Sequence, residues 1–201
     1  MTEQQKHSNQ RELSEQAEQP KTTDTPKQED QPLHTPQPNN SVHTQKEPRV
    51  VERLLIVCTG NTCRSPMAAA LARKYMPWAE VLSAGTATVA GLPASIGAMD
   101  AMQEMGLSID DHASRPLNPY LLEEADLILT MTRNHKKTIL NAMPETAGKV
   151  FTLGEFAGSQ MEIPDPFGLS AEEYLNCAKS LETLIKIAAE KCCPPPSNSE
   201  Q

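Results

Sequence analysis

The chain has 201 residues, enough for one domain with a tail, and its net charge is −8. Apolar residues make up only 38% and aromatic residues 3%. The low average comes from residues 1–48, which hold five apolar residues, six of the 17 prolines and no glycine, cysteine or aromatic residue. Such a segment cannot bury enough apolar surface to offset the entropy lost on ordering. We therefore expect a disordered extension over 1–48, a folded domain over 49–193 and a disordered tail over 194–201.

Composition and charge also exclude several classes of protein. No apolar run approaches the ~18 residues of a membrane helix, and the N-terminal segment lacks the apolar core of a secretory signal. The acidic balance argues against nucleic acid as the main partner. Five cysteines without a secretory signal indicate reduced thiols. We therefore expect a cytoplasmic protein without a membrane or nucleic-acid partner, and the oligomeric state stays open.

Buried strands alternate with helices along the domain. A β-branched run over 50–57 predicts the first strand, and a loop over 58–65 leads from it to a helix over 66–74. In chain order we then expect a strand over 80–83, a helix over 93–105, a strand over 126–130, a helix over 134–142, a strand over 149–153 and an amphipathic helix over 171–191. This alternation predicts a parallel α/β sheet.

The loop after the first strand carries the chemistry. It reads Cys58-Thr59-Gly60-Asn61-Thr62-Cys63-Arg64-Ser65. A Cys-x5-Arg loop that opens a helix can wrap a tetrahedral oxyanion, because its backbone N–H groups and the helix dipole direct positive charge inward. Arg64 can hold two phosphoryl oxygens, and the same field favours the nucleophilic thiolate form of Cys58. Ser65 can donate its hydroxyl to the sulfur, and Gly60 gives the backbone the freedom that the loop needs.

Two other interpretations of this loop fail. A Walker loop ends in Gly-Lys-Ser/Thr and binds nucleotide without a thiol. A zinc site needs a second pair of ligands, which the sequence does not offer downstream of Cys58 and Cys63. We therefore expect neither a Walker loop nor a zinc site here, and we assign the chain no metal and no cofactor.

Together with Asp165-Pro166-Phe167-Gly168, the loop resembles the low-molecular-weight protein tyrosine phosphatases. The segments Ser83-Ala84-Gly85-Thr86 and Asp111-His112-Ala113-Ser114-Arg115 add to the likeness, which spans about residues 52–190. It implies a four-stranded parallel sheet flanked by helices and a two-step phosphatase that acts on phosphorylated proteins without a metal. By the same likeness Cys58 attacks phosphorus, Arg64 binds phosphoryl oxygens, and Asp165 is first the general acid and then the base. The residues expected to bind the substrate are Thr59, Gly60, Asn61, Thr62, Cys63 and Ser65.

Two positions bear on the choice of substrate. Members that act on phosphotyrosine usually carry a bulky aliphatic residue at the position of Thr62 and often a Tyr at that of Phe167. The residues found here look like those of the bacterial protein arginine phosphatases. Thr is shorter than Ile or Leu and adds a hydroxyl, which would admit a broad polar guanidinium. We favour a phosphoarginine phosphatase over a phosphotyrosine phosphatase of the same fold.

Two further functions are less favoured. A thioredoxin-coupled arsenate reductase needs two additional cysteines close together on a mobile segment. Here no cysteine lies between Cys63 and Cys177, and we expect Cys192 and Cys193 to be exposed at the end of the last helix. A non-catalytic module that binds phosphorylated residues does not need the nucleophile and the acid, which are both present.

Four smaller expectations concern the surroundings of the loop. A reversible disulfide between Cys58 and Cys63 stays open. We expect Asn61 to brace the loop, and the family likeness suggests Ser83 as its hydrogen-bond partner. His112 and His135 are assigned no catalytic role.

Overall fold

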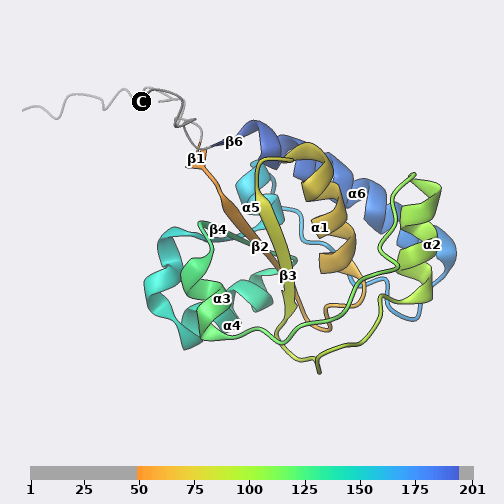
Figure 1. Cartoon of the computed structure of the whole chain (residues 1–201), viewed down its shortest axis with the longest axis horizontal. Coiled ribbons are helices and arrows are strands. Elements are labelled where there is room, and N and C mark those ends of the chain that lie inside the picture. The colour runs from red at the N-terminus through yellow and green to blue at the C-terminus, as the bar shows by residue number, and fades with distance from the viewer. Residues whose placement is uncertain (1–48, 195–201) are drawn as a thin grey trace, which may run out of the picture. The chain divides into compact units, whose positions relative to one another are not determined.

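The computed structural model describes residues 49–194 (Figure 1). The disorder expected for residues 1–48, and for residues 195–201 of the tail, concerns parts of the chain outside the described residues. In chain order the elements are β1 (Arg49–Val50), β2 (Arg53–Cys58), α1 (Arg64–Tyr75), β3 (Glu80–Gly85), α2 (Ile96–Glu104), α3 (Pro119–Glu124), β4 (Leu127–Thr130), α4 (Arg133–Ala142), a 3₁₀ turn η1 (Pro144–Gly148), β5 (Val150–Thr152), α5 (Leu153–Ala157), α6 (Ala171–Glu190) and β6 (Cys192–Cys193).

The main sheet has four parallel strands in the order β3-β2-β4-β5. Strand β2 lies inside it, and its Ile56 pairs with Ser83 of β3 on one side and with Leu129 of β4 on the other. The predicted fold class, a parallel four-stranded α/β sheet flanked by helices, is confirmed. Because all four strands run the same way, their carboxyl ends meet at one edge, where open α/β sheets bind ligands.

Helices cover both faces of this sheet, which explains the unbroken apolar run of β2. Leu54 and Ile56 pack in the core formed with α1 and α6, whereas Leu55 and Val57 pack in a second core with α3 and α4. Figure 1 shows α1, α2, α5 and α6 on one face and α3 and α4 on the other. Five of the six β2 residues are buried as a result, and the strand that carries Cys58 is held from both sides.

Side-chain caps set the ends of several elements differently from the sequence prediction. Ser95 accepts a hydrogen bond from the Ala98 N–H, so α2 begins at Ile96 and not near residue 93. Thr152 and Glu155 form a capping box, which makes Leu153 the first residue of α5 instead of the last of β5. Helix α3 was not predicted, because six residues are too few for a helical period to stand out.

The expectation that Cys192 is an exposed thiol was wrong. Strand β6 pairs in parallel with β1, with Arg49 opposite Cys192 and Val50 opposite Cys193. Cys192 is only 7% exposed, and burial raises its pKa to about 11. The pattern at the end of a helix could not show this, because the strand that covers Cys192 comes from the other end of the domain.

The described part of the chain also bears on a membrane location. Among residues 49–194, no helix combines the length and the apolar character that crossing a bilayer requires.

Candidate active site

The Cys-x5-Arg loop lies at the carboxyl edge of the sheet. Cys58 is the last residue of β2, and α1 starts at Arg64. Asn61 adopts a left-handed conformation (φ 53°), an uncommon choice for a residue other than glycine. Gly85, at the end of β3, leaves the room that the loop occupies, since a Cβ there would lie 2.6 Å from the Thr59 carbonyl oxygen. The loop is therefore shaped by its own backbone and by the neighbouring strand.

The sulfur of Cys58 lies among hydrogen-bond partners in the loop. The side chain is 2% exposed. The Asn61 N–H donates to the sulfur at 3.2 Å, and the Ser65 hydroxyl lies 3.0 Å from it. A thiolate can only accept, so with Cys58 ionised the Ser65 hydroxyl is the donor of this pair. The loop thus offers two donors to a negatively charged sulfur.

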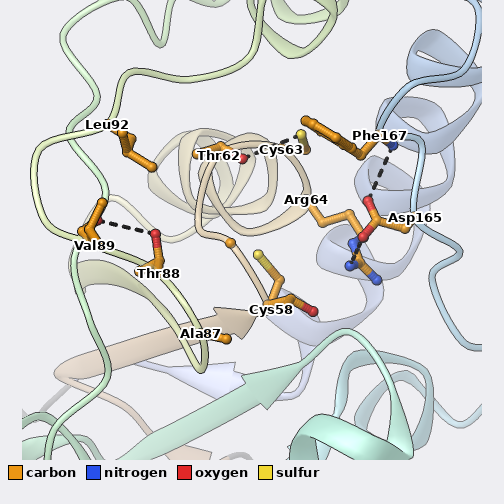
Figure 2. A pocket seen from close by; sticks show the side chains of 12 residues that line it. Cys58, Thr62, Cys63, Arg64, Ala87, Thr88, Val89, Leu92, Asp165 and Phe167 are labelled. Atoms are coloured by element: carbon orange, nitrogen blue, oxygen red, sulfur yellow. Dashed lines mark hydrogen bonds and ion pairs between the residues drawn. The ribbon is translucent and has the colours of Figure 1, made fainter.

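Arg64 and Asp165 face each other beside this sulfur (Figure 2). Arg64 is 5% exposed; its Nη1 donates to the Ile163 carbonyl at 3.2 Å, and its Nη2 forms an ion pair with Asp165 Oδ2. The Nε of Arg64 is buried and has no partner among the described residues. A buried donor without a partner is costly, and an oxyanion at the loop would satisfy it.

A pocket of about 700 Å³ opens over the loop. Figure 2 shows Phe167 beside Asp165 on one wall, with Thr88, Val89 and Leu92 across from it. Phe167 is 70% exposed. Of the residues expected to bind substrate, the pocket is lined by Thr59, Gly60, Thr62 and Cys63, but not by Asn61 or Ser65.

Asn61 instead braces the loop from behind, as expected. Its Nδ2 donates to Ser65 Oγ at 2.8 Å and to Ser83 Oγ at 2.9 Å. Its Oδ1 accepts from the Arg115 N–H at 2.8 Å, and its carbonyl accepts from His112 Nε2 at 2.6 Å. The predicted bond to Ser83 is confirmed, and these contacts hold the left-handed residue in place.

Both histidines contact the loop, although neither was assigned a role there from the sequence. His135 lies in the first turn of α4 and is 6% exposed. Its Nε2 lies 2.8 Å from Thr59 Oγ1, and its Nδ1 lies 2.8 Å from Thr132 Oγ1. Burial lowers the pKa of His135, and the Arg64 guanidinium lowers it further. Burial also lowers the pKa of His112. For His135, the one available signal in the sequence was its position in the first turn of a helix that follows a buried strand.

The Cys63 sulfur contacts the residue that caps α2 and a residue of α6. Its sulfur lies 3.0 Å from Ser95 Oγ and 3.6 Å from the Tyr174 hydroxyl of α6. It and Cys58 are both free thiols. Cys177, also on α6, is buried, and burial raises its pKa to about 12. The disulfide between Cys58 and Cys63 stays a prediction.

Metal ligands are not grouped in the described structure. Residues 49–194 contain no set of three or more His, Cys, Asp or Glu side chains placed to hold an ion. The loop, its arginine and the facing carboxylate place this chain in the class of cysteine-dependent α/β phosphatases.

Comparisons with known proteins agree with that class. Residues 53–191 match the family described as low molecular weight phosphotyrosine protein phosphatase, and the chain belongs to this family. It is 45% identical to a protein-arginine-phosphatase of Geobacillus stearothermophilus over 69% of this chain and 95% of the relative. It is 41% identical to the probable low-molecular-weight protein-tyrosine-phosphatase EpsP of Ralstonia nicotianae over 59% of this chain and 80% of the relative.

Among solved structures, arginine phosphatases have a similar fold. The YwlE arginine phosphatase of Geobacillus stearothermophilus is 44% identical and superposes with a TM-score of 0.67 over 70% of this chain and 92% of its own. A mutant YwlE arginine phosphatase with a phosphorylated active-site serine, 38% identical, superposes with a TM-score of 0.66 over 69% of this chain and 93% of its own.

Proposed function

We propose that this chain hydrolyses phosphoarginine in proteins through a cysteinyl-phosphate intermediate. The observation that supports the substrate choice is that Thr62 lines the pocket over the loop. Its hydroxyl has one contact among the described residues, a long one of 3.7 Å to the Cys63 sulfur. The hydroxyl therefore remains available to a polar substrate group. A relative that is 45% identical carries the name protein-arginine-phosphatase, which supports the same choice.

In the first step, the thiolate of Cys58 attacks phosphorus and the P–N bond breaks. Asp165 gives its proton to the departing guanidine nitrogen, which leaves as a neutral arginine side chain and then takes up a proton from water. Arg64 and the loop N–H groups bind the phosphoryl oxygens as charge develops on them. Arg64 Nη2 already binds Asp165 in this structure, so the phosphoryl group and Asp165 bind the same guanidinium. The Arg64 Nε has no partner among the described residues and can donate to a phosphoryl oxygen.

In the second step, Asp165 takes a proton from a water molecule whose oxygen attacks phosphorus. The S–P bond breaks, inorganic phosphate leaves, and the Ser65 hydroxyl donates to the sulfur that regains its negative charge. The 3.0 Å separation of Ser65 Oγ and Cys58 Sγ suits this role. Side-chain exposure of 48% leaves Asp165 accessible to water.

The test of the substrate is a comparison of kcat/KM for a phosphoarginine peptide and a phosphotyrosine peptide of equal sequence. We expect the parent to prefer phosphoarginine, and Thr62→Ile to shift the ratio toward phosphotyrosine by at least about tenfold, or roughly 1.4 kcal/mol. Replacing the hydroxyl by aliphatic bulk removes a partner for the guanidinium and offers apolar surface to a phenyl ring. Thr88→Val, on the far wall, is the matched control for loss of a hydroxyl.

Phosphotyrosine is the second candidate, because Val89, Leu92 and Phe167 give the pocket apolar walls that suit a phenyl ring. A parent enzyme that prefers phosphotyrosine would establish this alternative. If Thr62→Ile lowers kcat/KM equally for both peptides, Thr62 does not select the substrate. The phosphatase mechanism does not depend on that outcome.

We also infer that residues 49–193 form the catalytic domain and that it works in the cytoplasm on phosphorylated proteins. Cys58, Cys63, Cys177 and Cys192 are thiols outside any disulfide, which agrees with a reducing compartment. The net charge of −8 argues against nucleic acid as a partner. Fractionation of cells that express the full chain, with its activity followed in each fraction, tests the location.

A further inference from the structure

A second cavity, of about 500 Å³, lies behind the catalytic loop. Its polar lining consists of Arg73, Ser83, Ser108, Asp111, His112 and Arg115. None of these residues lines the catalytic pocket, so the two cavities are separate. The volume falls within the range of small-molecule sites and exceeds what one inorganic ion fills.

The charges around this cavity favour an anion. Arg73 comes from the end of α1 and Arg115 from the segment before α3. The Arg115 side chain has no hydrogen bond or ion pair among residues 49–194, and Arg73 uses one nitrogen on the Val81 carbonyl. Two guanidinium groups against the single carboxylate of Asp111 leave a net positive charge. Arg73 and Arg115 both lower the pKa of His112, and Asp111 raises it, so all three charges act on this ring.

Apolar side chains complete the lining. Pro66, Leu82 and Ile109 contribute carbon surface to the same cavity. A ligand that fills it therefore has an organic body as well as a charged group, because a bare ion would leave this surface in water.

Three of the lining residues also hold the catalytic loop. Ser83, His112 and Arg115 supply contacts to Asn61, the left-handed residue of the loop. A carbonyl oxygen only accepts, so His112 Nε2 carries the proton of its 2.6 Å bond to Asn61. Any ligand that ties these residues together also changes how firmly Asn61 is held.

We propose that this cavity is a second binding site for a small organic anion with a carboxylate or phosphate group. The anion bridges Arg73 and Arg115, which links the segment around His112 to α1. That link steadies Asn61 and the catalytic loop, and occupancy of the second site raises the activity of the first. The proposal does not depend on which phosphoamino acid the enzyme hydrolyses.

Backbone N–H chemical shifts of the ¹⁵N-labelled full chain test the site. The probes are citrate and propylphosphonate, because a phosphatase cleaves neither. We expect saturable shifts for residues 108–115 and Asn61, which disappear in the Arg73→Ala/Arg115→Ala double variant and persist in Lys137→Ala, an exposed lysine on α4. A response to citrate alone assigns a carboxylate ligand, and a response to propylphosphonate alone assigns a phosphate ligand. Shifts confined to residues 59–65, or unchanged in the double variant, overturn the site.

Hydrolysis of p-nitrophenyl phosphate tests the coupling. For each protein, kcat/KM is compared with and without the probe that binds. We expect the probe to raise kcat/KM of the parent at least twofold and to leave kcat/KM of the double variant unchanged. Arg115→Ala alone serves if the double variant does not fold, since the Arg115 side chain has no partner to lose in the described structure. Binding without a change in kcat/KM, or competitive inhibition alone, overturns the coupling.

Discussion

At the scale of single residues, the site depends on one sulfur and the donors around it. Cys58→Ser keeps the size of the side chain but replaces a thiol by a far less acidic hydroxyl in the same surroundings. We expect turnover of a small aryl phosphate to be lost while the melting temperature stays near that of the parent. The relevant measurement is kcat, with circular dichroism as the control for folding. Activity within about tenfold of the parent, or 1.4 kcal/mol in barrier, would contradict covalent catalysis by Cys58.

The buried His135 makes the stability of the domain depend on pH. Its pKa is lowered in the folded protein, so between that value and the ordinary value of about 6.5 the unfolded chain binds more protons. The free energy of unfolding therefore rises with pH through this window and falls as pH drops below about 6.5. We expect a lower melting temperature at about pH 5.5 than at about pH 7.5.

The variant His135→Gln isolates this contribution. Glutamine retains groups that can contact Thr59 and Thr132 but does not titrate. The difference in melting temperature between the two pH values should shrink in the variant, and the part that remains includes His112, whose pKa is lowered as well. An unchanged difference would show that the titration of His135 does not control stability.

At the scale of secondary-structure elements, β3 and the catalytic loop meet at Gly85. A Cβ on Gly85 would lie 2.6 Å from the Thr59 carbonyl, a backbone atom that cannot turn away. Gly85→Ala should therefore push the loop off its position, destabilise the domain by roughly 1–3 kcal/mol and lower kcat. Gly148→Ala is the matched control, because no atom lies within 4 Å of a Cβ there. Equal melting temperatures and rates for the two variants would contradict the close approach.

Most of the fold could be predicted because each main strand and helix has a local signal. The apolar run of β2, the helix-forming residues of α1 and the period of α6 each lie within one segment of the chain. Elements that depend on distant partners could not be predicted. Strand β6 has two residues and exists because β1 pairs with it, and the short helix α3 has too few residues for a period.

The same distinction applies to the site. The loop that holds Cys58 and Arg64 is contiguous in sequence, so its chemistry could be predicted from the spacing of these residues between a buried strand and a helix. The role of Asp165 needed the family likeness. The contacts of His112 and His135 with the loop join residues 51 and 76 positions apart, and the one local signal was the position of His135 in the first turn of a helix after a buried strand. The separation of Asn61 and Ser65 from the pocket lining also depends on the folded backbone.

At the scale of the whole molecule, residues 1–48 are expected to add nothing to the stability of the domain. Their composition offers almost no apolar surface to bury. Deletion of 1–48 should leave the melting temperature and the hydrolysis of small substrates unchanged. Deletion of 1–51 should lower the melting temperature, because it also removes β1 and the fully buried Val51. A large loss of stability in the shorter deletion would show that the extension packs on the domain.

The geometry of the described chain also bears on the arsenate reductase alternative. Cys192 and Cys193 pair with β1, which precedes the first residue of β2, whereas Cys58 is the last residue of that strand. The two cysteines therefore lie toward the amino ends of the main strands, whereas the catalytic loop lies at their carboxyl ends. That arrangement does not supply the nearby cysteines that such a reductase needs.

The pairing of β1 with β6 has a mechanical consequence. Because the two strands are parallel, tension applied at the N-terminal end of β1 and the C-terminal end of β6 pulls them in opposite directions along their length. The hydrogen bonds from Arg49 N to the Lys191 carbonyl and from Val51 N to the Cys193 carbonyl would then be loaded together in shear, and not opened one after the other. A tether at both flanks would strain this separate two-stranded sheet first, before the force reached Cys58 at the far end of β2.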